Sequence, residues 1–307
     1  MENSNSAGNY RNDSLLNEIL VTIFMSLNVA DLAAASLVCK SWNEACRDPS
    51  IWHKLDLSRL NSYYFNVPNK LRAWNDEHSN KKMTQFIKYV LSLSDRNTTC
   101  IIFNFYIYLR DAQFITAAER TPNLKRLVLP KTGELSNVAV EKAMKSWGGL
   151  ESITVTSIVR NSNKFSAICK YSKNMTEMKF SCDFVEDHAD AMIEYTRNLK
   201  VLSVRSIIVS MKALCRVLTF LEHLEAVNIC HSMILDTTGG PRSKVVVYRT
   251  ISDLQKRLAP SCLGKLIFCE DGNCLRCKNA CDTIPRRQPY GPFEGIWRED
   301  EITSLAH

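Results

Sequence analysis

This 307-residue chain lacks the features that would mark a membrane, secreted or nucleic-acid-binding protein. No apolar run approaches the roughly 18 residues that a membrane span requires. Residues 1–13, MENSNSAGNYRND, lack the basic flank and apolar core of a secretory signal, so we expect the 12 cysteines to be reduced, in the nucleus, the cytoplasm or both. The 39 basic residues are opposed by 32 acidic ones without a block of like charge, so the net charge of +7 identifies no nucleic-acid partner.

Catalytic and nucleotide-binding motifs are absent as well. The chain has no G-x-S-x-G, G-x-x-x-x-G-K-[ST], G-x-G-x-x-G or H-E-x-x-H. Residues 239–244, GGPRSK, look like a phosphate-binding loop, but Pro241 removes an amide donor that such a loop needs. His53 and His188 have no acid or cysteine at catalytic spacing, so we expect both to be surface histidines. We therefore predict a non-catalytic protein without a cofactor.

A degenerate repeat of about 25 residues fills most of the chain. Six segments share the pattern apolar-x-x-apolar-x-apolar, whose last two positions alternate as in a strand with one buried face. The segments are Cys100/Phe103/Phe105, Leu124/Leu127/Leu129, Leu150/Ile153/Val155, Met175/Met178/Phe180, Leu199/Leu202/Val204 and Leu224/Val227/Ile229. A seventh, Leu263/Leu266/Phe268, follows after 39 residues, because the loop around residues 237–244 is inserted before it.

Each of the first six segments is preceded by a helical stripe at minus ten, minus seven and minus six, such as Phe114, Ala117 and Ala118. A unit of one helix and one strand cannot bury its own stripe, so neighbouring units must stack. The expected fold is therefore an α/β solenoid of about seven helix–strand units. The pattern resembles the leucine-rich repeat, although the asparagine or cysteine usual in that family is replaced by Tyr108, Thr132 and other residues.

Three short helices are predicted before the repeats. Apolar residues from Leu15 to Phe24 form a broad helical face that Asp13 or Ser14 can cap. A second helix is expected after Asp31, and a third from Lys40 to about Pro49. Three such helices make a very small core that depends on a partner or on the neighbouring domain.

The same stretch resembles the F-box, whose outline is L-P-x-E-[IL]-L-x-x-I-F, then D-L, V-C-[KR]-x-W and L-W-x-x-L. Matching residues include Glu18-Ile19-Leu20, Ile23-Phe24, Asp31-Leu32, Val38-Cys39-Lys40-x-Trp42 and Trp52, whereas Leu16 replaces the proline of the motif. The resemblance implies binding of a Skp-type adaptor, and through it a cullin. The adaptor-binding residues that it implies are Leu15, Leu16, Ile19, Leu20, Ile23, Phe24, Leu32, Val38, Trp42 and Trp52. Alternatively, these apolar residues form only the core of the small helical domain.

An F-box followed by degenerate repeats is similar to the plant F-box/LRR-repeat proteins, and the C-terminal GIWREDEITSLA is similar to the tail of that group. We predict a disordered tail over residues 1–12, the F-box over 13–58, a linker over 59–83, the solenoid over 84–268 and a cysteine-rich cap over 269–307. In the last segment, Cys269, Cys274, Cys277 and Cys281 could hold a zinc ion, but only one C-x-x-C pair is present. A hydrophobic cap built on Phe293, Ile296 and Trp297 is the favoured alternative.

The outward-facing strand residues line the concave face, which solenoids use for binding. Its mixed charge favours a protein or peptide ligand, and the candidate contacts are Tyr106, Arg126, Thr154, Lys179, Arg205 and Asn228. The resulting hypothesis is the substrate-recognition subunit of a Skp–cullin–F-box ubiquitin ligase. Two alternatives stay open: an F-box interaction protein without ligase activity, and a small-molecule sensor with a pocket in the solenoid.

Overall fold

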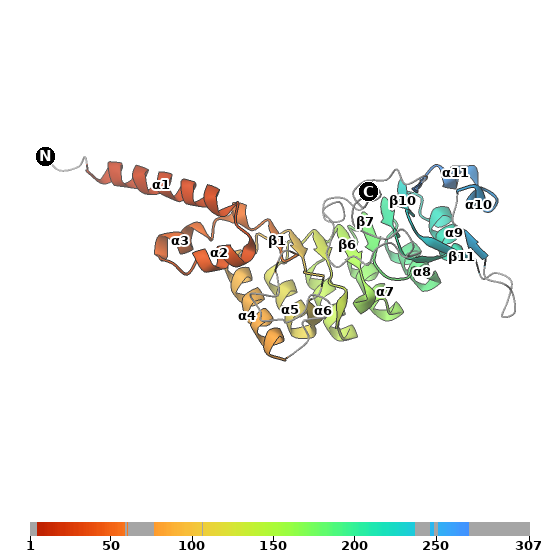
Figure 1. Ribbon diagram of the computed structural model, residues 1–307, viewed down its shortest axis with the longest axis horizontal. Coiled ribbons are helices and arrows are strands. Elements are labelled where there is room, and N and C mark those ends of the chain that lie inside the picture. Colours follow the sequence, from red (N-terminus) through yellow and green to blue (C-terminus); the bar gives the residue numbers. More distant parts are fainter. Residues whose placement is uncertain are drawn as a thin grey trace, which may run out of the picture.

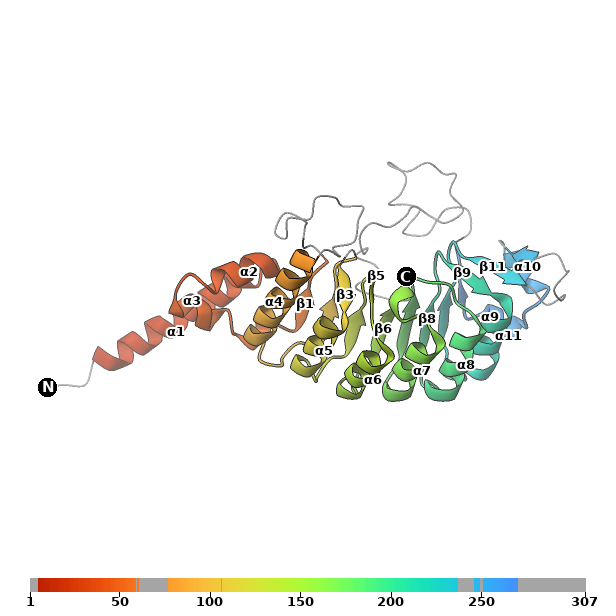
Figure 2. The same ribbon diagram turned by 90° about the horizontal axis from the view of Figure 1, so that it is seen from below.

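The structure, a computed structural model of the chain, describes residues 5–58, 60, 77–105, 107–236, 246–248 and 251–269. It is elongated, with the N-terminal helices at one end and a curved array of helices and strands beyond them (Figures 1 and 2). The first helix projects from the end of the array. The predicted architecture, a small helical domain followed by an α/β repeat, is confirmed.

The N-terminal domain consists of α1 (Asn5–Phe24), α2 (Val29–Ala35), α3 (Lys40–Ala45) and the 3₁₀ turn η1 (Pro49–Ile51). Helix α1 begins at Asn5, within the segment predicted to be a disordered tail. Residues 5–24 contain no proline, so the helix can extend towards the N-terminus beyond the predicted start. Helix α2 is capped by Asn28 rather than by Asp31, since the Asn28 side chain accepts hydrogen bonds from the amides of Ala30 and Asp31.

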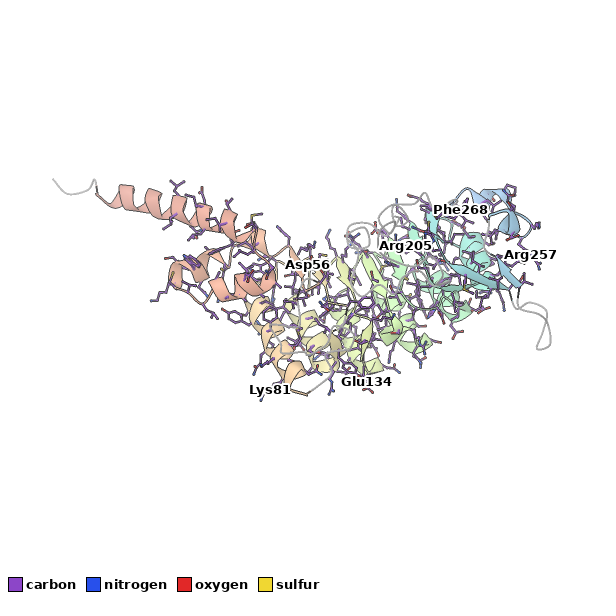
Figure 3. The ribbon with its side chains drawn as sticks, viewed as in Figure 1. Asp56, Lys81, Glu134, Arg205, Arg257 and Phe268 are labelled. Carbon is purple, nitrogen blue, oxygen red and sulfur yellow. The ribbon has the colours of Figure 1, made fainter. Side chains whose placement is uncertain are left out.

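One parallel sheet of eight strands runs the length of the array in the order β1-β2-β4-β6-β7-β8-β10-β13. Its strands are β1 (Lys54–Asp56), β2 (Cys100–Ile102), β4 (Arg126–Val128), β6 (Ser152–Val155), β7 (Glu177–Phe180), β8 (Val201–Ser203), β10 (Ala226–Asn228) and β13 (Leu266–Ile267). The helices that stack beside it are α4 (Glu77–Leu93), α5 (Asp111–Arg120), α6 (Asn137–Ser146), α7 (Ser162–Tyr171), α8 (Glu186–Tyr195) and α9 (Met211–Phe220). Figure 3 shows Asp56 and Arg205 on the strand side of the molecule and Lys81 on the helix side.

Shorter elements complete the units. They are β3 (Tyr108–Arg110), β5 (Thr132–Glu134), η3 (Ser157–Val159), β9 (Ile208–Ser210), β11 (Met233–Asp236), β12 (Val246–Tyr248), α10 (Ile251–Gln255) and α11 (Pro260–Leu263). Strands β3 and β5 pair in parallel, and β12-β11-β9 form a separate three-stranded sheet. The inserted loop at residues 237–244 lies outside the described residues.

The predicted repeat register holds for the later units. Leu127, Ile153, Met178, Leu202, Val227 and Leu266 occupy equivalent sheet positions in successive strands. In the first unit the prediction is wrong by two residues, because Ile101 rather than Phe103 pairs with Leu127. Every second residue of a strand faces the same side, so a slip of two keeps the apolar pattern and the sequence could not reveal it. The helix stripes are buried as predicted, with Ile193 partly covered.

A repeated backbone hydrogen-bond pattern joins neighbouring strands at the end of the sheet where the strands begin. The carbonyl of Thr99 accepts from the amides of both Lys125 and Arg126, at 2.8 and 3.0 Å. Equivalent pairs of bonds go to the carbonyls of Lys125, Glu151, Thr176 and Lys200 in the following units. The series starts in the N-terminal domain, where the His53 carbonyl accepts from Thr99 and Cys100, both at 3.0 Å.

The N-terminal domain is therefore joined to the repeats by backbone pairing as well as by side chains. Strand β1 adds to β2 through Leu55, opposite Ile101, although the segment lies within the predicted F-box range. Helix α4 likewise begins within the predicted linker, at Glu77. The Ser36 and Tyr89 hydroxyls are 2.6 Å apart, and one buried apolar cluster extends from Phe24 to Leu266.

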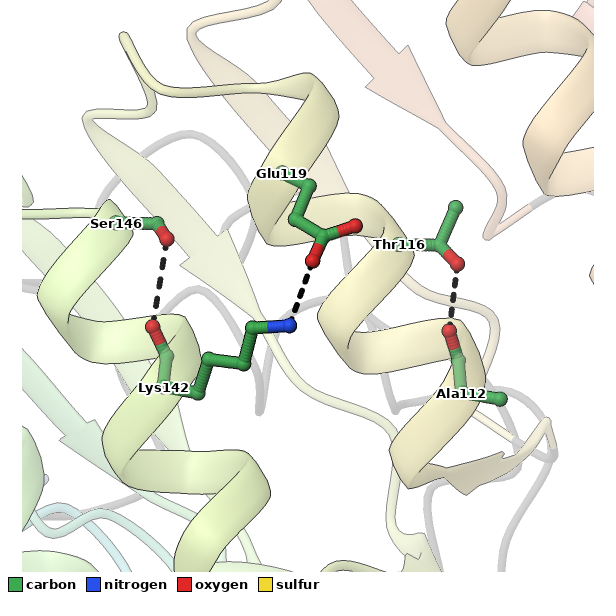
Figure 4. A network of polar contacts seen from close by, with 5 residues as sticks. All are labelled: Ala112, Thr116, Glu119, Lys142 and Ser146. Atoms are coloured by element: carbon green, nitrogen blue, oxygen red, sulfur yellow. Dashed lines mark hydrogen bonds and ion pairs between the residues drawn. The ribbon is translucent and has the colours of Figure 1, made fainter.

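Polar contacts join neighbouring helices on the helix side. Lys142 of α6 pairs with Glu119 of α5 at 2.7 Å, while Thr116 and Ser146 bond to carbonyls of their own helices (Figure 4). Both charged side chains are about half exposed, so this pair contributes little to stability. Packing of the apolar stripes is the main stabilising interaction between units.

Candidate functional site

Exposed apolar side chains are concentrated on the N-terminal helices. Twelve large apolar residues are exposed in the described part of the chain, and seven lie between residues 15 and 38. We call these seven the apolar surface: Leu15, Leu16, Ile19, Ile23, Met25, Leu37 and Val38. A group of this size in so short a segment is typical of a protein–protein interface.

Helix α1 divides its apolar residues between two faces. Leu15, Ile19 and Ile23 are spaced by four residues and point to solvent, with Ile23 51% exposed. On the other face Phe24 is only 2% exposed and meets the Trp42 ring edge to face, with centroids 5.3 Å apart. This aromatic contact holds α1 against α3 and leaves the outer stripe uncovered.

The turn between α2 and α3 supplies the remaining exposed apolar groups. The amides of Leu37 and Val38 donate to the carbonyls of Ala34 and Ala35, both at 3.1 Å. Asn43 donates from its side chain to the Ser36 carbonyl at 2.7 Å. These bonds fix the backbone while the Leu37 and Val38 side chains stay exposed.

The structure separates the predicted adaptor-binding residues into three groups. Leu15, Leu16, Ile19, Ile23 and Val38 are exposed, and Leu20 and Trp42 are partly covered. Phe24, Leu32 and Trp52 are buried in the core, so the prediction that they line the outer surface is wrong. All three side chains belong to the buried apolar cluster. Trp52 also donates a hydrogen bond from Nε1 to the Cys46 carbonyl at 2.7 Å.

Two residues of the apolar surface were missed by the sequence analysis. Met25 directly follows the matched Ile23-Phe24 pair, and Leu37 directly precedes the matched Val38. Continuity of the apolar run was the available signal. The motif outline did not include them because those positions carry no fixed residue.

The predicted target-binding residues lie along the sheet but are mostly covered. Thr154 and Lys179 pair across β6 and β7, and Asn228 continues the row on β10. Thr154, Lys179, Arg205 and Asn228 are all buried, so they form no open contact surface, which corrects the prediction. Arg126 is partly exposed, and Tyr106 lies outside the described residues.

An open groove occurs one row closer to the strand N-termini. This edge groove has a cavity volume of about 390 Å³ and is lined by the residues at the starts of five adjacent strands. They are Lys54, Thr99, Cys100, Lys125, Arg126, Glu151, Ser152, Thr176 and Glu177. Arg126 reaches across β6 to pair with Glu177 at 2.7 Å, and Lys125 pairs with Glu151 at 3.0 Å.

His188 is buried, contrary to the predicted surface position. Its Nδ1 accepts from the Val185 amide at 3.3 Å, and Nε2 is 2.9 Å from the Arg160 carbonyl. Phe165, Phe180 and Phe184 pack around the ring. Burial lowers the pKa of His188, and both nitrogens are occupied by backbone, so the ring is a structural residue.

The cysteines of the described residues are free thiols. Burial raises the pKa of Cys46 and Cys100 to about 11 and that of Cys182 to about 12, so these thiols are not activated nucleophiles. No metal-binding group of histidines, cysteines and acids occurs within the described ranges. Of the zinc candidates only Cys269 is described; Cys274, Cys277 and Cys281, and the cap residues Phe293, Ile296 and Trp297, lie outside them.

None of the helices described is long and apolar enough to cross a membrane.

Comparison with known proteins agrees with the two-part architecture. A family model described as F-box-like matches residues 16–58. An F-box/LRR-repeat protein of Arabidopsis thaliana is 32% identical over 296 residues, covering 95% of each chain. A putative F-box protein of the same plant is 25% identical and covers 94% of each. The Arabidopsis F-box protein SKIP1 is 27% identical over 41% of this chain and 40% of its own length.

A helical domain with an exposed apolar surface, followed by a parallel repeat sheet, defines an F-box protein with a leucine-rich-repeat solenoid. The chain belongs to the plant F-box/LRR-repeat family. The F-box match over residues 16–58 supports an adaptor-binding role.

Proposed function

We propose that this protein is the substrate-recognition subunit of a Skp–cullin–F-box ubiquitin ligase. The apolar surface supports this proposal most directly, because it lies within the matched F-box except for Leu15, and its side chains are exposed in the part of the chain that the structure describes. It would bind a Skp-type adaptor and through it a cullin, while the solenoid holds a protein target.

The chain would act by proximity rather than by chemistry. Holding a target lysine beside a ubiquitin carrier raises the effective concentration of the two reactants. Strand β1, the His53 carbonyl and the Ser36–Tyr89 contact fix the F-box to the solenoid, so the target is held in a set orientation. We also propose a nuclear or cytoplasmic location, in line with the free thiols of the described residues.

The test is reconstituted ubiquitination of proteins captured by proximity labelling. Targets should be labelled by the intact chain, and ubiquitination should require adaptor, cullin and this protein together. The matched control carries Leu16→Glu, Ile19→Glu and Ile23→Glu, which change exposed side chains and preserve the solenoid.

Deleting the whole F-box is a poorer control because it removes β1 and His53 from the sheet. Adaptor binding without ubiquitination of any captured protein would instead favour an interaction protein without ligase activity.

A further inference from the structure

The outward face of the main sheet carries a continuous row of buried polar side chains. Thr154, Lys179, Ser203 and Asn228 lie opposite one another on β6, β7, β8 and β10. Each of the four is at most 2% exposed. The residues on either side of them in each strand point into the core beneath the helices. The row therefore faces away from the helices, on the side where Figure 3 shows Arg205.

Among the described residues, the contacts that cover this face lie near its first strands. Val128, which continues the row on β4, packs with Phe105 in a small apolar cluster separate from the main core. Asn104 donates from its side chain to the carbonyls of Ser58 and Leu60, at 2.9 and 2.8 Å. From β6 to β10, by contrast, the stacked helices lie on the opposite side of the sheet (Figures 1 and 2). The burial of the row there requires a cover from another part of the chain or from a partner.

This cover has to supply negative charge. Lys179 is 2% exposed and Arg205 6% exposed, both on the outward face. Both cations have interaction partners, yet none of the ion pairs formed between described residues includes either of them. Burying a cation is costly unless an anion or several acceptors accompany it. We therefore expect the covering segment to bring carboxylates to these two side chains.

The C-terminal segment, residues 270–307, has the right starting point and length. It lies outside the described residues and follows Cys269, two residues beyond the end of β13, the strand beside β10. Lys179 on β7 is three strand spacings from β13, or about 14 Å. The 38 residues of the segment would extend over about 125 Å, so the segment is long enough to cross the row.

The charge of the segment also fits. It contains the acidic run Glu299-Asp300-Glu301 near its end. Residues 237–245 contain Arg242 and Lys244 but no acid, and they join β11 to β12, whose facing ends are Asp236 and Val246. Residues 61–76 contain a single acid, Asp76, next to the start of α4. Of these three segments, only the C-terminal one offers a cluster of carboxylates.

We propose that residues 270–307 dock on the outward sheet face from β6 to β10, with the run Glu299-Asp300-Glu301 placed against Lys179 and Arg205. The contact is intramolecular, and it goes beyond the proposed function without depending on it. A protein target would then meet the docked segment and the exposed rims of the solenoid rather than the row on the sheet.

The test is acetylation of lysines in the purified full chain by an N-hydroxysuccinimide ester, with the rate at each lysine read by mass spectrometry. Lys179 should be protected, whereas Lys142, which is 54% exposed, serves as the reactive internal standard. Reversing the run with Glu299→Lys, Asp300→Lys and Glu301→Lys should raise the rate at Lys179 at least about tenfold, because the segment then opens. Lys142 should react at the same rate in both proteins.

Glu270→Lys with Asp271→Lys is the matched control. These two acids belong to the same segment but lie within about 7 Å of Cys269 even when the chain is extended, so they cannot reach Lys179. Lys179 should stay protected in this variant. Cys169, which is fully buried on α7, reports on folding because it should not react with N-ethylmaleimide in any of the proteins.

A chain that ends at Cys269 provides a second variant and should also expose Lys179. Rapid acetylation of Lys179 in the wild type would overturn the proposal, because the face would be open. Protection that survives both charge reversal and truncation would overturn it by assigning the cover to another segment. Protection lost only when a dimer is diluted would assign the cover to a second copy of the chain. Reaction of Cys169 together with Lys179 in the charge-reversed chain would show general unfolding and contradict a local contact.

Discussion

Phe24 and Trp42 meet edge to face, with ring centroids 5.3 Å apart and ring planes at 66°. The neighbouring side chain, Ile23, points to solvent and is 51% exposed. Two adjacent residues of the F-box motif therefore have different roles. One stabilises the domain, and the other is available to a partner.

Truncation of these two residues should separate folding from binding. Phe24→Ala removes a buried aromatic ring and should lower the free energy of unfolding by about 3 kcal/mol or more. Ile23→Ala should change it by less than about 0.5 kcal/mol while weakening adaptor binding. Chemical denaturation and calorimetric titration with the adaptor measure the two effects. Equal loss of stability in both variants would show that Ile23 also belongs to the core.

The junction between F-box and solenoid depends in part on Tyr89. Its hydroxyl donates to Ser36 Oγ at 2.6 Å, because the Ser36 hydroxyl itself donates to the Ala33 carbonyl. Tyr89→Phe should cost about 1 kcal/mol and speed amide hydrogen exchange in α2. Tyr171→Phe is the matched control, since the Tyr171 hydroxyl donates to Glu141 within the solenoid. Unchanged exchange in α2, or equal acceleration in the control, would contradict a role for Tyr89 at the junction.

His188 should make the solenoid sensitive to acid. Burial lowers its pKa in the folded state below the ordinary value of 6.5, despite the opposing effects of the Arg160 carbonyl, Asp187 and Asp183. The unfolded chain therefore takes up the proton first. The stabilisation is complete above about pH 6.5 and is lost as the pH falls towards the folded-state pKa, by at most about 1.4 kcal/mol per pH unit.

The measurement is the free energy of unfolding against pH for the wild type and for His188→Gln. Glutamine can accept from the Val185 amide and donate to the Arg160 carbonyl, but it does not titrate. The wild type should lose stability more steeply below about pH 6.5. Parallel curves would show that the buried imidazole contributes nothing to the pH dependence.

Periodicity predicted the repeat fold well because a solenoid places equivalent residues at equivalent positions. Leu127, Ile153 and Met178 face the same core, and their spacing is visible in the sequence. The register of the first strand could not be predicted from the sequence, since a shift of two residues between Ile101 and Phe103 leaves the same face apolar. His188 was also predicted to lie on the surface, although its ring packs among phenylalanines that only the fold brings together.

The candidate site was predicted in composition but not in exposure. A motif shows which residues the F-box uses, yet Phe24 and Ile23 match it equally well. Only packing against Trp42 shows that one of them is covered. On the sheet, alternation correctly placed Thr154, Lys179 and Asn228 in one row. It could not show that these residues are buried while Arg126 and Glu177 line an open groove.

The central claim is that the apolar surface binds the adaptor, and calorimetric titration of the full chain with a Skp-type adaptor tests it most directly. Leu16→Glu, Ile19→Glu and Ile23→Glu together should weaken binding at least about a hundredfold, because each places a charge in an apolar interface. A variant with Val138→Glu and Phe220→Glu, two exposed apolar residues on the solenoid helices, should bind as the wild type does. Wild-type affinity in the triple variant, or no binding by the unmodified chain, would contradict the account.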